Sequence, residues 1–206
     1  SAYAVLILFS AFALVPILWA FGTSLKPETQ ILQYPPNWLP SSYTWTHYYN
    51  VLFRSNFPTY FLNSMLVAAI SIVVSLFIAS HAAYAASRFR FKGMNLLLFL
   101  ILMTSMIPGI AVLIPLYLTS VKVGIYDTFF VMILIYTAWR TPMLTWVLKG
   151  FFDAIPREIE EAAKVDGCSP WRAFYQLILP VSQPGLAAGA LLSAVYVWND
   201  FLVAFS

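Results

Sequence analysis

Charged residues are scarce in this chain of 206 residues, and their scarcity excludes a soluble globular domain. Only 9% of the residues are charged, whereas 61% are hydrophobic and the mean hydropathy is +0.80. Soluble domains carry about 25% charged residues. The short alternating segments of an outer-membrane barrel are also missing, because the apolar runs are continuous and near membrane-spanning length. The composition therefore predicts an all-α, polytopic membrane helix bundle surrounded by the lipid bilayer.

The residues and motifs of the common catalytic sites are missing as well. The chain has one cysteine, Cys168, and two histidines far apart in the sequence, so neither an internal disulfide nor a metal site is expected. It contains no G-x-x-x-x-G-K-[ST], H-E-x-x-H or G-x-S-x-G pattern. All basic residues except Arg140 lie in loops, which gives no reason to expect nucleic acid as a partner. We therefore expect no catalytic residue, no metal and no cofactor in this chain.

What the chain does have is a set of five long apolar runs, each near the 20 or so helical residues that cross a bilayer. The runs are Ala2–Phe21, Tyr60–Ala86, Met94–Leu118, Thr128–Leu148 and Gln183–Phe205. Pro16, Pro108 and Pro142 fall inside three of them, and each should kink its helix because proline lacks a backbone donor. An odd number of spans leaves the termini on opposite sides, so we expect a sixth span beyond this chain.

The basic residues are distributed unevenly over the loops, and this predicts an orientation. The loop 24–59 and the loop after the third run together carry three basic residues, whereas the loop after the second run and the loop 149–182 carry seven. The positive-inside rule places the loops richer in Lys and Arg in the cytoplasm. We therefore expect one transmembrane domain over residues 1–206, with residues 24–59 as an external loop and residues 149–182 as a cytoplasmic loop.

The loop 149–182 holds the densest group of charges, with six charged residues between Arg157 and Asp166. Ile159, Ala162 and Ala163 recur at helical spacing and would form one small apolar face. A helix with such a face suits docking into a groove on a soluble partner. A well-capped connector that lies on the membrane surface would have the same spacing, so the pattern alone leaves both interpretations open.

Local signals in this loop predict two short helices separated by a glycine turn. Pro156 can begin the first helix, and Glu160 and Lys164 have the favourable i, i+4 order of an ion pair. Gly167 can end that helix in a left-handed conformation. Ser169 and Pro170 then have the pattern of an N-cap and a first helical position, which starts a second helix.

Residues in this loop and in the spans around it also carry a family resemblance. The loop contributes Glu161, Ala162, Ala163, Asp166, Gly167, Leu179 and Pro180. Their spacing resembles the EAA motif of binding-protein-dependent ABC transporter permeases, with Leu177 where that family usually has isoleucine. The pair Asp166-Gly167 is similar to the sugar-transport branch, as are Asn63-Ser64 and the segment 198–201. The chain thus resembles a type I ABC importer permease, specifically the shorter, six-span partner in maltose-type sugar permease pairs.

This resemblance implies partners and a mechanism. A dimer of separate ATPase subunits would bind ATP and Mg²⁺ and contact the loop as a coupling helix, so the chain itself would not be an enzyme. A second sugar permease subunit would complete the pore, and an extracytoplasmic solute-binding protein would deliver the sugar for import. The resemblance assigns the main coupling roles to Glu161 and Gly167. It also implies a multi-pass protein of the bacterial or archaeal plasma (inner) membrane.

Three residues inside the spans are candidates for the translocation path, namely Arg140, Trp198 and Asn199. A charge at mid-bilayer costs about 2.5–3.5 kcal/mol on insertion scales, so Arg140 must pair within the bundle, face a cavity or cap a neighbouring helix. An aromatic face and an amide suit a hydroxyl-rich solute, although Trp198 would equally suit the membrane interface. Asp200 should lie near the external interface, away from Arg140.

Two further patterns predict helix packing. Gly185 and Gly189 match the G-x-x-x-G pattern, which indicates a close helix contact with an unspecified partner. His81 lies in an apolar run, where a helix–helix hydrogen bond is favoured over a proton relay.

Two other functions stay open at this point. An EAA-type permease for a non-sugar solute would share the loop motif. An ion-coupled secondary carrier would need inverted repeats and buried carboxylates, whereas Asp200 is the single acidic residue inside an apolar run.

Overall fold

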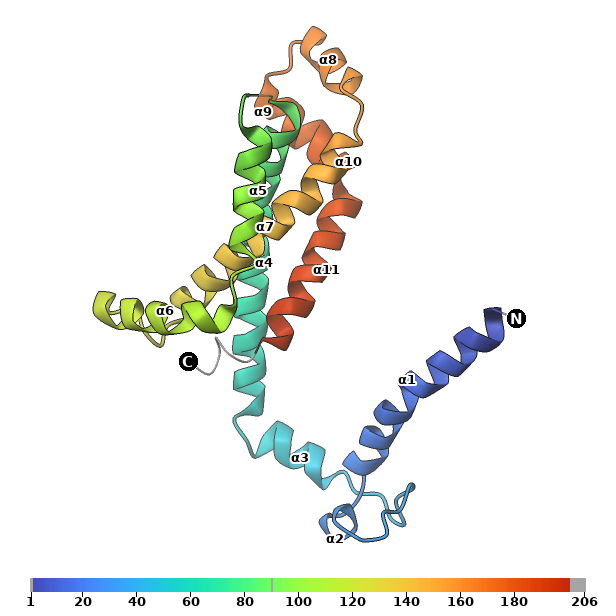
Figure 1. Ribbon diagram of the computed structural model, residues 1–206. Coiled ribbons are helices and arrows are strands. Elements are labelled where there is room, and N and C mark those ends of the chain that lie inside the picture. Colours follow the sequence, from blue (N-terminus) through green and yellow to red (C-terminus); the bar gives the residue numbers. More distant parts are fainter. Residues whose placement is uncertain (1, 90, 201–206) are drawn as a thin grey trace. The chain divides into compact units, whose positions relative to one another are not determined.

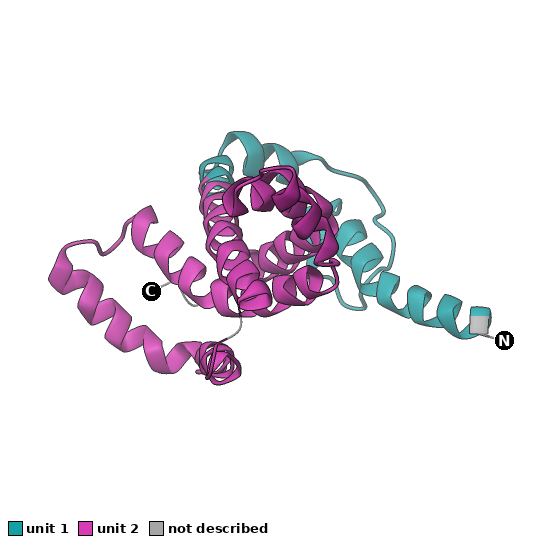
Figure 2. Cartoon of the chain, turned by 90° about the horizontal axis from the view of Figure 1, so that it is seen from above, with its two compact units in different colours: residues 1–62 teal, residues 63–206 magenta. Residues whose placement is uncertain are grey.

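The computed structural model describes residues 2–89 and 91–200, and every regular element within them is a helix (Figure 1). The chain divides into two compact units, residues 1–62 and residues 63–206 (Figure 2). The first unit contains α1 (Ala2–Ser24), α2 (Glu28–Ile31) and α3 (Thr46–Phe53), and α4 (Phe57–Arg88) runs from it into the second. The second unit continues with α5 (Met94–Thr104), α6 (Gly109–Val123), α7 (Phe129–Asp153), α8 (Glu158–Val165), α9 (Pro170–Ala173), a π-helix (Phe174–Ile178), α10 (Leu179–Val181) and α11 (Gln183–Asn199).

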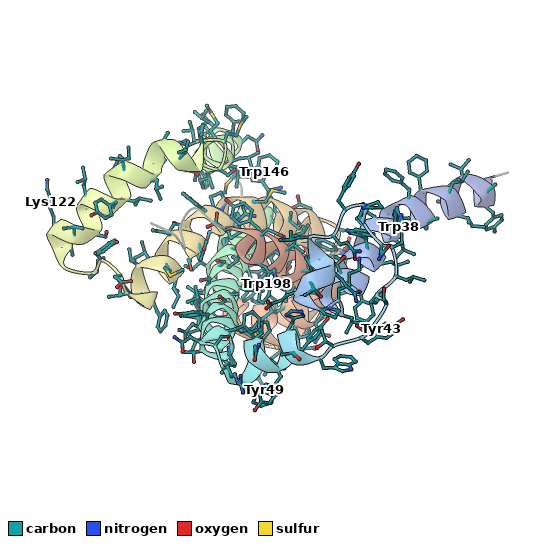
Figure 3. The ribbon with its side chains drawn as sticks, turned by 90° about the horizontal axis from the view of Figure 1, so that it is seen from below. Trp38, Tyr43, Tyr49, Lys122, Trp146 and Trp198 are labelled. Carbon is teal, nitrogen blue, oxygen red and sulfur yellow. The ribbon has the colours of Figure 1, made fainter. Side chains whose placement is uncertain are left out.

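In the first unit, the segment that follows α1 is folded around a buried lysine. Lys26 is only 2% exposed, and its ammonium group donates a hydrogen bond to the carbonyl of Asn37 at 2.5 Å. The same group lies 4.5 Å from the ring centroid of Trp19, which packs edge-on against Trp38. Trp38 is labelled in Figure 3. His47 binds the backbone carbonyl of Lys26 at 2.9 Å. The predicted loop 24–59 therefore has a defined local structure with two short helices of its own.

In the second unit, α4 packs through small residues that recur at every fourth position. The buried side chains on this face are Val67, Ser71, Ser75, Ala79, Ala83 and Ser87. Small side chains let helix backbones approach closely, which is how helices associate in a lipid environment where apolar burial alone gives little. Ala79 and Ala83 belong to the main core cluster, together with Leu148 and Phe152 of α7 and Phe174 of the π-helix.

The close helix contact predicted from Gly185 and Gly189 is confirmed, and the structure identifies its partners. A Cβ atom built on Gly185 would lie 2.5 Å from Cγ of Phe151 on α7. A Cβ atom on Gly189 would lie 2.9 Å from Leu144 on α7 and 3.4 Å from Leu76 on α4. The glycines of α11 therefore let this helix lie directly against α7 and α4.

The run Met94–Leu118 is not one kinked helix as predicted. It is two helices, α5 and α6, which meet at an angle of 82°. Pro108 stands between them with ψ 126°. A proline breaks a helix here because it lacks a backbone donor and disfavours the helical region at the residue before it. The helix α6 then continues to Val123 and ends at Gly124 with φ +77°.

The other predicted runs correspond to helices of the structure. Three helices are long and apolar enough to cross a membrane, and the number rises to five if each of two bent pairs forms one span. The second bent pair joins residues 170–181 to α11 at 71°. Pro16 and Pro142 lie inside α1 and α7. Residues 201–206, which include the end of the fifth predicted run, lie outside the described residues.

Candidate coupling site

The helix α8 lies at one end of the second unit, beyond the ends of α4 and α7 (Figure 1). Its C-terminus has the hydrogen bonds of a Schellman motif: Cys168 N–H donates to Ala163 O at 2.9 Å and Gly167 N–H to Lys164 O at 3.0 Å. Gly167 adopts φ +82°, as predicted. The side chain of Ser169 accepts a hydrogen bond from the backbone of Arg172 at 3.3 Å, which confirms it as the predicted N-cap. The helix starts at Glu158, slightly later than the predicted start at Pro156.

The predicted ion pair between Glu160 and Lys164 is wrong. The carboxylate of Glu160 forms an ion pair with the guanidinium of Arg88 at the end of α4, and it also accepts a hydrogen bond from the Tyr84 hydroxyl at 2.9 Å. Glu160 is only 6% exposed, whereas Lys164 is exposed to solvent. The reason is geometric, because Glu160 lies on the inner face of α8 with the buried Ala163, one turn away.

Arg88 contacts three segments at once. Besides the ion pair with Glu160, its Nη1 donates to the carbonyl of Phe152 at 3.0 Å and to the Ser87 hydroxyl at 3.0 Å. Its Nη2 donates to the carbonyl of Ile155 at 3.2 Å. The last carbonyls of a helix have no partner within the helix, and a cation there is favourable for the helix dipole. Arg88 therefore caps the end of α7 while it holds α8.

Further hydrogen bonds join the same three segments around Arg88. The Ser87 hydroxyl donates to Asp153 at 2.6 Å, and Lys149 pairs with the other oxygen of Asp153 at 2.5 Å. Arg157, just before α8, donates to the backbone carbonyl of Ser87 at 3.1 Å. We call the side chains of Tyr84, Ser87, Arg88, Asp153, Arg157 and Glu160 the anchor network.

The predicted coupling residues are not all on one surface. Glu161, Ala162, Asp166, Gly167 and Pro180 are exposed. Ala163 is 5% exposed and faces the bundle, while Leu179 packs partly buried against the main core cluster. The apolar face predicted from residues 159, 162 and 163 is therefore split, because 159 and 162 are exposed and 163 is buried. The outward face of α8 is mixed, because the charged Glu161 and Lys164 stand beside the apolar Ile159 and Val165, and Val165 is 88% exposed.

The candidates for the translocation path have different surroundings. The guanidinium of Arg140 lies over the ring of Tyr196 on α11, with Cζ 3.5 Å from the ring centroid. This stacking differs from the carbonyl capping that was one of the expected arrangements. Trp198 is 55% exposed, and the side chain of Asn199 donates to the carbonyl of Val195 at 2.7 Å. Asp200 ends α11 and accepts a hydrogen bond from Tyr136 at 3.0 Å.

The helix–helix hydrogen bond predicted for His81 is confirmed. One ring nitrogen contacts the hydroxyl of Tyr175 at 2.7 Å, and the other contacts the carbonyl of Phe77 at 2.6 Å. The residues missed by sequence reasoning are Tyr84 and Arg88 as partners of Glu160. A signal was available, since Tyr84 and Arg88 are one turn apart on α4, beside its stripe of small residues.

The fold and this site define a polytopic helical membrane protein that holds a short, charged loop helix at the end of its bundle. The family described as binding-protein-dependent transport system inner membrane component matches residues 78–205, which include the whole anchor network. The chain belongs to this family. The predicted resemblance, the permease fold and the inner-membrane location are thereby confirmed.

Curated relatives and a solved structure agree with this assignment. The chain is 35% identical over 195 residues to the trehalose transport system permease protein SugB of Mycobacterium tuberculosis, covering 95% of this chain and 70% of SugB. It is 34% identical over 201 residues to the diacetylchitobiose uptake system permease protein NgcG of Streptomyces coelicolor, covering 98% of this chain and 66% of NgcG. The chain therefore spans roughly two thirds of the length of these relatives. A crystal structure of a bacterial ABC transporter involved in the import of the acidic polysaccharide alginate matches with TM-score 0.82 and 27% identity, over 96% of this chain and 70% of that one.

Proposed function

We propose that this chain is one of the two permease subunits of an ATP-driven sugar importer. Its membership of the permease family supports the role in transport. Relatives named for the transport of trehalose and diacetylchitobiose support a sugar as the solute. In this proposal a second permease completes the pore, an extracytoplasmic binding protein delivers the sugar, and ATP with Mg²⁺ binds to a separate ATPase dimer.

The observation that carries the coupling role is the outward face of α8. Glu161 is exposed, and its side chain makes no hydrogen bond or ion pair within the described part of the chain. It stands on a helix that is closed by the Gly167 turn and held by buried neighbours on its inner side. A helix face that combines charged and apolar side chains suits a groove on the ATPase. ATP binding there would shift the permease between two states because the two states contact α8 differently.

We further propose that Arg140, Trp198 and Asn199 contribute to the sugar path. The exposed indole of Trp198 offers an aromatic face to a sugar ring, and the amide of Asn199 adds a hydrogen-bonding group one residue later. Arg140 and Tyr196 form a stacked pair on facing helices that can donate hydrogen bonds to hydroxyl groups. These residues would discriminate among solutes less than the binding protein does.

The test begins with the tagged full-length protein, purified from its native membranes in mild detergent and analysed by mass spectrometry. We expect a P-loop ATPase and a second permease to co-purify. The complex is then reconstituted in proteoliposomes with its binding protein, and uptake of labelled disaccharides is measured with ATP or with a non-hydrolysable analogue. Uptake that persists without ATP and follows an ion gradient would contradict the proposal and favour a secondary carrier. ATP-dependent uptake of a non-sugar solute alone would retain the permease role and reject the sugar.

A further inference from the structure

Two adjacent glutamates on α8 point in opposite directions. Glu161 is exposed, whereas Glu160 is buried against the end of α4. The side chains of Arg88 and Glu160 are only 9% and 8% exposed. A carboxylate and a guanidinium withdrawn from water in this way require partners for their remaining hydrogen-bonding groups, and Tyr84 and two backbone carbonyls supply them.

We infer that Arg88 and Glu160 are positioning residues that lock α8 to the ends of α4 and α7, so that force applied to α8 reaches the membrane spans. This inference rests on the proposed coupling role of α8 and deepens it. Neither residue needs to touch the ATPase or the sugar, because both lie on the inner side of α8. They act by keeping α8 in one orientation relative to the bundle.

The first argument concerns the connection between α7 and α8. Residues 154–157 join the two helices. If this short connection were the only link between them, α8 could rotate independently of α7. The anchor network crosses that connection twice. Arg88 binds Ile155 O within it and Glu160 beyond it, and Arg157 binds the carbonyl of Ser87 on α4. These directional bonds hold the connection and the helix beyond it, and they prevent α8 from rotating relative to α7.

The second argument concerns the choice of arginine. The guanidinium has five N–H donors in a fixed plane, and Arg88 uses them on a carboxylate, a hydroxyl and two carbonyls at once. A lysine at this position would keep the positive charge, but its single ammonium group cannot hold acceptors from three segments in one geometry. The Arg88→Lys substitution therefore keeps the positive charge and removes the fixed hydrogen-bond geometry, so it tests the geometry alone.

The test uses the reconstituted full transporter with its ATPase and binding protein. Arg88→Lys and Glu160→Gln are compared with the wild type. Arg172→Lys is the matched control because Arg172 is exposed on the same loop and its side chain bonds only Gln176 within the described residues. Three quantities are measured: ATPase retained per permease, the Michaelis constant for ATP, and sugar taken up per ATP hydrolysed. We expect the first two to stay near wild type and the third to fall about ten-fold in both variants, within the 5–150-fold range typical of coupling between sites.

The double variant Arg88→Lys with Glu160→Gln sharpens the result. If the two side chains act as one unit, the double variant should be no worse than either single variant, since effects of contacting residues are not additive. Wild-type uptake per ATP in an intact complex, or a multiplicative fall of roughly a hundred-fold in the double variant, would overturn the inference. A loss of retained ATPase with unchanged uptake per ATP would also overturn it, because the network would then only stabilise the complex. Failure of the proposed function differs, because the wild type itself would then show no ATP-driven uptake.

Discussion

The α8 end of the second unit and the crossing of α11 over α7 are stabilised in different ways. At the α8 end, Arg88, Glu160 and Asp153 make short charge-assisted hydrogen bonds between segments far apart in the sequence. At the crossing, Gly185 and Gly189 let the two helices approach until their side chains interlock. Directional bonds fix an orientation, whereas close packing provides the contact that apolar burial cannot supply in lipid. The comparison indicates that α8 requires a defined orientation relative to the ends of α4 and α7, whereas α11 and α7 require a defined interhelical distance.

The largest effect should come from filling the helix crossing. In Gly185→Leu, the new Cβ alone would lie 2.5 Å from Cγ of the Phe151 ring, so the ring or the helix must shift. Overpacking of this kind typically costs 1–3 kcal/mol, and we expect the upper end of this range because the rest of the leucine side chain adds further atoms to the contact. We expect little folded protein, measured as the monodisperse fraction in size-exclusion chromatography after extraction in mild detergent.

Gly150→Ala is the control for this substitution. Gly150 is exposed on α7, and a Cβ atom there would meet nothing within 4 Å. Alanine favours the helix interior over glycine by about 1 kcal/mol, so this variant should be as stable as the wild type or slightly more so. A Gly185→Leu protein with the wild-type elution profile would show that α11 does not pack on α7 as described.

The next largest effect should come from Gly167, at the α8 end. Its φ of +82° costs other residues about 1–2 kcal/mol and costs β-branched residues more, although space around it is open. In Gly167→Val the Schellman turn should open and change the direction of the chain after α8. We expect uptake per ATP hydrolysed to fall several-fold in proteoliposomes while the amount of folded permease changes little.

Gly124→Val provides the same backbone strain away from the coupling site. Gly124 ends α6 with φ +77°, and it also has open space around it. Gly124→Val should lower the thermal stability by about as much as Gly167→Val does, without changing uptake per ATP. An equal loss of uptake per ATP in the two variants would assign the effect of Gly167→Val to general stability and not to coupling.

The features that sequence reasoning predicted well depend on neighbours within a few residues. The end of α8 at Gly167 and the N-cap Ser169 are local, because each is decided by the hydrogen bonds of one turn. The close approach at Gly185 was also predictable, although its partner was not. The helix that packs against Gly185 is determined by tertiary packing, which cannot be read from local patterns in a single sequence.

The partner of Glu160 shows why the rest was missed. Lys164 has the right spacing, yet an exposed i, i+4 pair is worth only about 0.3–0.5 kcal/mol. Arg88 lies 72 residues away in the sequence and offers a buried site with several bonds, so tertiary structure overrides the local preference. The break at Pro108 was likewise foreseen only as a kink, because the 82° angle depends on how α6 lies relative to α7.

The smallest effect should come from the polar contact inside the packed region. Arg140 stacks on Tyr196, and its Nε atom is buried with no hydrogen-bond partner within the described residues. Because the Tyr196 ring is 37% exposed, the cation–π contact is worth about 0.5–1 kcal/mol, so Tyr196→Leu should lower the melting temperature by about 1–4 °C, whereas Tyr196→Phe keeps the ring and should change it little. The measurement is thermal unfolding of the purified transporter in detergent. Equal melting temperatures for the two variants would show that the ring does not stabilise Arg140.

A weaker apparent affinity for sugar in Tyr196→Leu alone would support a place for Arg140 on the translocation path, because the stacked ring would then set the direction of the guanidinium.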